Sequence, residues 1–205
     1  MNNIHKEILV WIQLGFFVLI WVGVLFISGS ELRIGWEAIK KLPDVVTIYI
    51  LIVLLFIKWA WRWPIFKNWL VRLPDLQGTW KGTIESTWVD PDTGQKITTK
   101  DTTLVIKQSF SSISCVMYTD ESYSHSVAAQ IYEDNKNGIF FLTYNYINRP
   151  QVSVRDRSVT HDGAVILKVI LRPEKRLEGE YWTNRKTTGD INFIFESRKL
   201  VQSKN

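Results

Sequence analysis

Two almost wholly apolar stretches lie near the N-terminus. Residues 8–27 are apolar with Gln13 as the one clearly polar member, and as a helix they measure about 30 Å, the thickness of a bilayer's hydrocarbon core. A second run, residues 45–57, reaches about 26 Å if the helix continues through residues 58–61 and Lys58 extends its ammonium towards the headgroups. The pattern predicts two transmembrane helices, about 8–27 and 45–61, rather than two buried helices of a soluble core.

The charges beside these runs predict an orientation. Basic side chains are most frequent after the second run, where Lys58, Arg62, Lys67 and Arg72 follow one another. By the positive-inside tendency, both termini and the rest of the protein are cytoplasmic. A cleaved signal peptide is the alternative for residues 1–27. Its apolar part would be too long and its basic start only Lys6 beside Glu7, so we expect the segment to remain.

After Pro74 the pattern becomes that of β-strands. In residues 76–89, Trp80, Ile84 and Ser86 fall on one face, and threonines and charged residues fall on the other. The sequence DPDTG at 90–94 predicts a turn. Residues 148–162 are polar and are interpreted as a long loop or irregular strand. The further strands are predicted at 96–108, 112–119, 122–133, 139–147, 164–171, 176–184 and 190–199.

These eight strands predict a closed, antiparallel, up-and-down barrel of the lipocalin-like kind. It occupies residues 76–205 as a cytoplasmic ligand-binding domain, after a membrane anchor of residues 1–75. Closure removes the edge strands that invite aggregation. A barrel of eight strands holds one small ligand or is filled by its own side chains. A two-sheet sandwich is the alternative that the pattern leaves open.

The charge distribution limits the choice of partners. Residues 1–75 carry eight basic and five acidic side chains, and residues 76–205 carry seventeen and fifteen, so the net charge of +5 divides into +3 and +2. The basic excess per residue therefore lies mainly beside the membrane, where it meets anionic lipid. A nearly neutral soluble part argues against a surface for polymeric nucleic acid. The single cysteine, Cys115, excludes a disulfide within the chain.

The sequence offers no catalytic constellation. His5, His125 and His161 lie far apart, and no zinc-protease, Cys-x-x-Cys, nucleophile-elbow or phosphate-loop motif is present. We predict no catalytic residue, no metal and no cofactor, hence a protein that is not an enzyme. A phosphodiesterase is the least favoured class, because nothing assembles a metal or a general base.

Candidate ligand-binding residues gather where the seventh predicted strand turns into the eighth. If the Trp80 face is inward, polar groups inside the barrel lead into a turn rich in hydrogen-bond donors. An aromatic ring can stack on a base, hydroxyls and an amide can contact its edges, and an arginine can bind phosphate with two hydrogen bonds. The candidate set is Trp80, Ser86, Tyr181, Thr183, Asn184, Arg185 and Thr188. An exposed hairpin turn is the alternative interpretation.

Two segments carry a family resemblance: LQGTWKG at 76–82 and LEGEYWTNRKTTG at 177–189. With two short N-terminal spans and a barrel, the chain resembles the two-transmembrane β-barrel effectors of bacterial cyclic-oligonucleotide antiphage signalling systems (CBASS). The resemblance implies that the barrel binds a cyclic dinucleotide and that the protein forms homo-oligomers. The spans would then disrupt the inner membrane, and the infected cell would die.

Two other functions stay open. The sequence GTW at 78–80 is similar to the Gly-x-Trp of lipocalins, in which a basic residue of the last strand packs on the tryptophan; here that residue would be Arg198. A lipocalin-like, membrane-anchored lipid-binding protein without a signalling role is therefore the main alternative, and it predicts an apolar cavity. A module that docks a partner protein at the membrane would have a filled barrel and an exposed apolar patch.

Overall fold

The structure is a computed structural model that describes residues 6–29, 35–67, 69–89, 94, 99–156 and 158–203. The chain divides into two compact units, Met1–Val71 and Arg72–Asn205.

The first unit is helical. It contains α1 (Lys6–Ile27), α2 (Trp36–Lys40) and α3 (Leu42–Lys58), followed by the short 3-10 helices η1 (Ala60–Arg62) and η2 (Pro64–Phe66). The ring of Tyr49 on α3 lies 6.3 Å from Phe16 and 5.7 Å from Phe17 on α1. Other large apolar side chains of α1 are exposed, Phe26 by 79%. A helix with this much exposed apolar surface is suited to lipid rather than to water.

Among the described helices, one segment, Val10–Ile27, is long and apolar enough to cross a membrane by length and composition. The second predicted span, 45–61, differs from α3. This helix begins earlier, with Pro43 in its first turn, and it ends at Lys58 because Trp59 has non-helical dihedral angles of −135° and −49°. The prediction that residues 59–61 continue the helix is wrong, since Ala60–Arg62 form a 3-10 helix instead.

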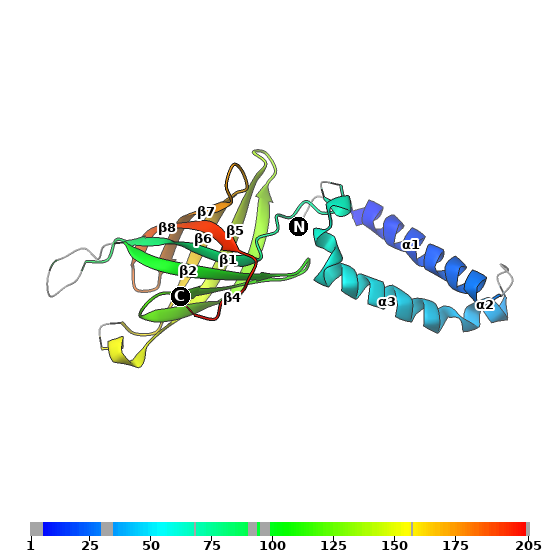
Figure 1. Cartoon of the computed structure of the whole chain (residues 1–205), viewed down its shortest axis with the longest axis horizontal. Coiled ribbons are helices and arrows are strands. Elements are labelled where there is room, and N and C mark those ends of the chain that lie inside the picture. Colours follow the sequence, from blue (N-terminus) through cyan, green and yellow to red (C-terminus); the bar gives the residue numbers. More distant parts are fainter. Residues whose placement is uncertain are drawn as a thin grey trace. The chain divides into compact units, whose positions relative to one another are not determined.

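The second unit is a closed barrel of eight antiparallel strands in chain order (Figure 1). The strands are β1 (Gly78–Ser86), β2 (Lys100–Gln108), β3 (Ile113–Tyr118), β4 (Ser122–Asp134), β5 (Ile139–Pro150), β6 (His161–Ile170), β7 (Arg176–Thr183) and β8 (Thr188–Ser197). Each strand pairs with the next, and β8 returns to pair with β1. The predicted barrel is confirmed, and the sandwich is excluded.

The largest difference from the predicted strands lies in residues 148–162. β5 continues to Pro150 and β6 begins at His161, with the 3-10 helix η3 (Val152–Val154) between them. Pairing with neighbouring strands explains the extension, because Asn148 lies opposite Ser124 on one side and His161 on the other. Polar composition alone made this segment look like a loop. The predicted turn at 90–94 lies, except for Gly94, outside the described residues.

The inward-facing residues are those predicted from the alternation. Trp80, Leu177, Ile191 and Phe193 are buried in the barrel core. The ring of Phe195 packs edge-on against Trp80, with 5.1 Å between centroids. The basic residue predicted at this position, Arg198, instead forms an ion pair with the Asp75 carboxylate, 2.7 Å from Nη1 to Oδ2.

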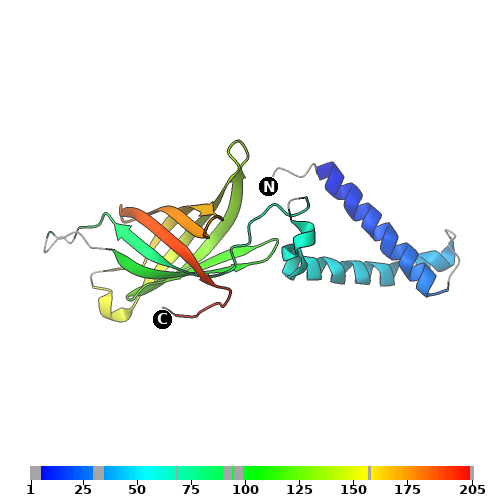
Figure 2. The same cartoon turned by 45° about the horizontal axis from the view of Figure 1, so that its top comes forward.

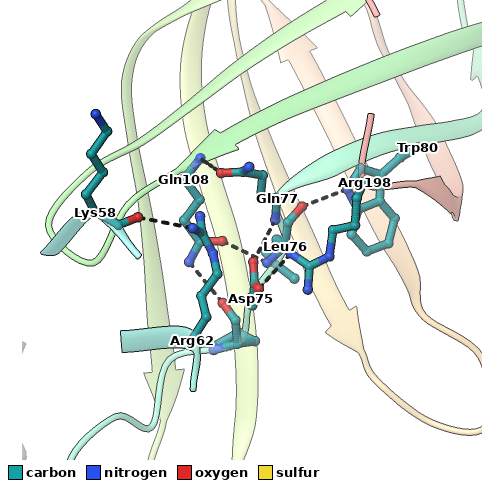
Figure 3. A network of polar contacts seen from close by, with 9 residues as sticks. Lys58, Arg62, Asp75, Leu76, Gln77, Trp80, Gln108 and Arg198 are labelled. Carbon is teal, nitrogen blue, oxygen red and sulfur yellow. Dashed lines mark hydrogen bonds and ion pairs between the residues drawn. The ribbon is translucent and has the colours of Figure 1, made fainter. Parts of the chain in front are cut away.

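Gln108 ties the segment leading into β1 to one end of the barrel, which we call the floor (Figure 3). Its Oε1 accepts a hydrogen bond from the Leu76 N–H (2.7 Å), and its Nε2 donates to the Pro74 carbonyl (3.0 Å). The indole N–H of Trp80 donates to the Leu76 carbonyl (2.9 Å). Because Gln108 is buried, its amide satisfies backbone groups that water does not reach.

The C-terminal segment turns back along the outside of the barrel (Figure 2). Thr79, which points outward from β1, is fully buried beneath it. The Thr79 hydroxyl donates to the Lys199 carbonyl and accepts from the Val201 N–H. The segment after β8 therefore shields the outer face of β1 next to the floor.

Replacing Gln108 by alanine should lower the free energy of unfolding by about 1 to 3 kcal/mol, because the Leu76 N–H and the Pro74 carbonyl lose their buried partner. Denaturant unfolding of the full chain in detergent, followed by tryptophan fluorescence, measures this. Gln130→Ala is the matched control, since Gln130 is exposed on β4 and should change stability by no more than about 0.5 kcal/mol. Equal effects of the two variants would contradict the proposed role of Gln108.

Candidate functional site

The end of the barrel opposite the floor, here called the mouth, contains a cavity of about 500 Å³. Fully buried side chains such as Leu104, Leu142 and Leu177 fill the interior nearer the floor. A cavity of this volume suits a small-molecule ligand. It is lined by residues from all eight strands and from the mouth loops, namely Ile84, Ser86, Trp88, Lys100, Met117, Thr119, Glu121, Ser122, Tyr146, Asn148, Asp156, Ser158, His161, Val165, Tyr181, Thr183, Arg185, Thr187 and Ile191.

Two tyrosine rings in this wall lie over glycines of the neighbouring strands. A Cβ on Gly189 would come within 2.6 Å of the Tyr181 ring, and one on Gly163 within 2.5 Å of the Tyr146 ring. Glycine is therefore what leaves room for each ring. The Tyr181 hydroxyl donates to Ser86 Oγ (2.9 Å), and burial raises the pKa of both tyrosines. Both hydroxyls are therefore neutral at physiological pH.

The turn between β7 and β8 is organised around the Thr183 hydroxyl. This oxygen lies 2.6 Å from Thr187 Oγ1 and accepts a hydrogen bond from the Arg185 N–H (3.2 Å). Lys186 has a φ of 61°, in the left-handed region, which closes the turn. The backbone of Arg185 is thereby fixed at the mouth.

The guanidinium of Arg185 lies beside β6. Its Nη1 is 3.4 Å from Ser158 Oγ and 3.5 Å from His161 Nδ1. The same His161 nitrogen is closer to the Val159 carbonyl (3.0 Å), so we assign the proton to Nδ1, which donates to that carbonyl. Lys100, the other cation of the lining, is paired with Glu121 at 3.0 Å. No ion pair joins Arg185 to a carboxylate in the described part of the chain, so its charge is available to an anionic ligand.

The structure brings four of the seven predicted site residues into this cavity: Ser86, Tyr181, Thr183 and Arg185. The other three are not in its lining. Trp80 lies in the packed core towards the floor. Asn184 has an exposed side chain, and its N–H donates to the Asp162 carbonyl. The Thr188 hydroxyl contacts that of Thr87 at 3.0 Å on the exposed rim.

Comparison with known proteins identifies the family. Residues 71–194, more than half of the chain, match the family described as Cap15, cyclic dinucleotide receptor domain. The chain belongs to the Cap15 family. A curated relative, CD-NTase-associated protein 15 of Staphylococcus schleiferi, is 27% identical over 181 residues, which cover 88% of this chain and 90% of the relative. The resemblance to CBASS effectors drawn from the sequence is thereby confirmed.

Several cavity residues of this Cap15-family barrel were not predicted from its sequence. Tyr146, Asn148, His161 and Lys100 all line the cavity. Alternation contained the signal for Tyr146 and Asn148, which share the parity of the core residue Leu142 on β5. Asn148 was missed because the segment from residue 148 was interpreted as a loop, and Tyr146 because the inward face of the predicted strand 139–147 was not worked out. Lys100 likewise lies on the same face of β2 as the buried residues Leu104 and Ile106.

The reactive groups of this Cap15-family barrel can be examined one by one. Cys115 is buried, and burial raises the pKa of its thiol, so the thiol stays protonated and unreactive. Among the described residues, no group of three or more His, Cys, Asp or Glu side chains is placed to hold a metal ion. The charged groups of the lining are the Arg185 guanidinium, the Lys100–Glu121 ion pair and the Asp156 carboxylate, and neutral donors, acceptors and aromatic rings complete it.

His161 should make the stability of the folded barrel depend on pH. Burial lowers its pKa below the ordinary value of 6.5, and the charge of Arg185 acts in the same direction, against the Val159 carbonyl and Asp162. The unfolded chain therefore takes up a proton at a higher pH than the folded one. This lowers the free energy of unfolding as pH falls below 6.5 towards the folded pKa.

Denaturant unfolding of the wild type and of His161→Gln, between about pH 5 and 8, measures this dependence. The variant should lose part of the decline in stability at acid pH. Profiles of equal slope in the two proteins would show that the ring does not titrate differently on folding.

Proposed function

We propose that this protein is a membrane-anchored CBASS effector that binds a cyclic dinucleotide in the mouth cavity of its barrel and acts without catalysis. The match to the cyclic dinucleotide receptor domain supports the ligand class. The single structural observation that carries the proposal is the cavity itself, which Arg185, the buried Tyr146 and the half-buried Tyr181 line in an otherwise packed barrel.

The lining suits an anionic nucleotide better than a lipid. The phosphates of the ligand would interact with Arg185, and its bases would stack on Tyr146 or Tyr181. The lipid-carrier alternative predicted an apolar cavity. The described lining instead includes Asn148, Arg185, Asp156 and the Lys100–Glu121 ion pair, and these polar groups would be unfavourable against an acyl chain.

We further propose that α3 is a second span beside α1. Its 17 residues measure about 26 Å, which local thinning of the bilayer accommodates. The Thr47 hydroxyl donates to the Pro43 carbonyl (2.8 Å) and so is satisfied within the helix. Lys58, in the last turn, holds its ammonium 4.7 Å from the Trp59 ring, an arrangement suited to the headgroup region. The excess of basic residues after α3 supports a multi-pass inner-membrane protein whose termini and barrel are cytoplasmic.

Ligand binding would then favour a homo-oligomer whose spans disrupt the inner membrane and kill the infected cell. A ligand drives this change only if it binds the assembled state more tightly than the monomer. Gln13 is exposed on α1 and offers a hydrogen bond between neighbouring helices, worth about 0.5 to 2 kcal/mol in a membrane. Repetition of this contact around an assembly would contribute to its stability.

Replacing Arg185 by glutamine should weaken cyclic dinucleotide binding by about 1.5 to 3 kcal/mol, roughly ten- to hundredfold in Kd, because a charge-assisted contact to phosphate is lost. Calorimetry of the full chain in detergent with cyclic di-AMP, cyclic di-GMP and cyclic GMP–AMP measures this. Arg149→Gln is the matched control, since Arg149 is exposed on the outside of β5 and should leave the Kd unchanged. A wild type that binds none of the three, while binding fatty acid, would favour the lipid carrier.

The effector role predicts that ligand alone releases a dye trapped in liposomes containing the full chain. Release should begin at ligand concentrations near the Kd, and Arg185→Gln should need proportionally more ligand. Light scattering or crosslinking in the same samples follows assembly. Tight binding with neither assembly nor release would rule out the membrane-disruption step and leave the receptor role intact.

A further inference from the structure

A row of polar residues follows consecutive strands around the mouth of the barrel. Ser124 on β4 faces Asn148 on β5, and Asn148 faces His161 on β6. Arg185, beyond the end of β7, contacts His161 and continues the row. Ser124, Asn148 and His161 all lie on the inward faces of their strands. Asn148, His161 and Arg185 line the cavity.

The β4–β5 end of this row is buried and lacks partners. Ser124 is 2% exposed, and its Oγ has no hydrogen-bond partner. Asn148 is 8% exposed, and no hydrogen bond joins its side-chain amide to another described residue. By contrast, the nearby Thr119 hydroxyl is paired with Ser122 at 3.0 Å. Buried polar groups are nearly always hydrogen-bonded. The Ser124 hydroxyl departs from this rule, as do the hydroxyls of Thr103 and Tyr144, whereas Asn148 lines the cavity, where a ligand can supply the partner that its amide lacks.

We propose that Asn148, which lies opposite Ser124 in the β4–β5 pairing, contacts the edge of a nucleotide base and sets the base preference of the receptor. This inference rests on the proposed function and names the specificity determinant of the same cavity. A side-chain amide presents a donor and an acceptor side by side, the combination that distinguishes base edges. A phosphate carries no such information, so Arg185 binds without selecting a base.

The spacing along the row fits one nucleotide. Neighbouring strands lie about 4.8 Å apart, which puts β7, the strand leading to Arg185, roughly 10 Å from Asn148 on β5. Tyr146 projects from the same face of β5 as Asn148, two residues away. A base resting on the Tyr146 ring therefore offers its edge to the amide, while its phosphate reaches towards Arg185.

The test compares base preference with overall affinity. Calorimetry on the full chain in detergent gives Kd values for cyclic di-AMP, cyclic di-GMP and cyclic GMP–AMP. Asn148→Leu and Asn148→Ala should reduce the ratio between the weakest and tightest Kd about 5- to 150-fold. Ser124→Ala should reduce the ratio less. Asn145→Ala is the matched control, because Asn145 is exposed on the outer side of the same strand and should change neither ratio nor affinity.

Two readouts separate base recognition from a structural role. Arg185→Gln should weaken all three ligands by a common factor, and Asn148→Leu should leave the thermal unfolding midpoint equal or raised, since it removes an unpaired amide. The inference is overturned if the Asn148 variants weaken all ligands equally, or if the wild type has no preference. If the wild type binds none of them, the proposed function fails first. Should Asn148→Leu not fold, Asn148→Ala and Ser124→Ala decide the question.

Discussion

The pairing of β8 with β1 is the interaction on which the rest of this barrel depends. It runs from Thr79 to Ser86, with one register shift beside Trp80, and it leaves neither terminal strand as an open edge. Closure also decides which face of every strand is inside, because side chains alternate along each strand. The same pairing brings β7 and β1 to either side of β8, so that Tyr181 reaches Ser86 across the glycine at 189. The cavity wall is thus a consequence of closure.

The barrel and a part of the site could be predicted because both depend on a period of two. Alternation placed Trp80, Leu177 and Phe193 inside, and it directed Ser86, Tyr181 and Thr183 into the cavity, which Arg185 joins from the turn after β7. Where the prediction failed, the observed structure depends on a contact with a residue distant in sequence. Polar composition hid the pairing that extends β5 to Pro150. The ion pair with Asp75 holds Arg198, whose expected place against Trp80 is taken by Phe195.

The interior is divided along the barrel axis into a filled half and a hollow half. Towards the floor, leucines and Trp80 are fully buried, and Gln108 satisfies the backbone of the incoming segment. Towards the mouth, the cavity and the unpaired Ser124 hydroxyl make the free energy of unfolding lower than a fully packed interior would give. Such a division keeps the fold stable through one end while the other end stays open to a ligand. The charged side chains of the lining, Lys100, Glu121, Asp156 and Arg185, all lie at the mouth end.

This division limits how a ligand in the cavity can change the behaviour of the whole protein. The segment leading from the helical unit joins the barrel at the floor, where Leu76 and Trp80 are fully buried and rearrangement is costly. The cavity lining lies instead at the mouth end of the barrel, and it includes Arg185 in the β7–β8 turn and the Lys100–Glu121 ion pair. A conformational change transmitted from the cavity through the floor would require the side chains of that core to adopt a second packing arrangement. Contact between mouth loops of neighbouring copies needs none, because the ligand would reshape the contacting surface itself. If the receptor assembles on binding, the surface through which its copies contact one another is therefore expected at the mouth.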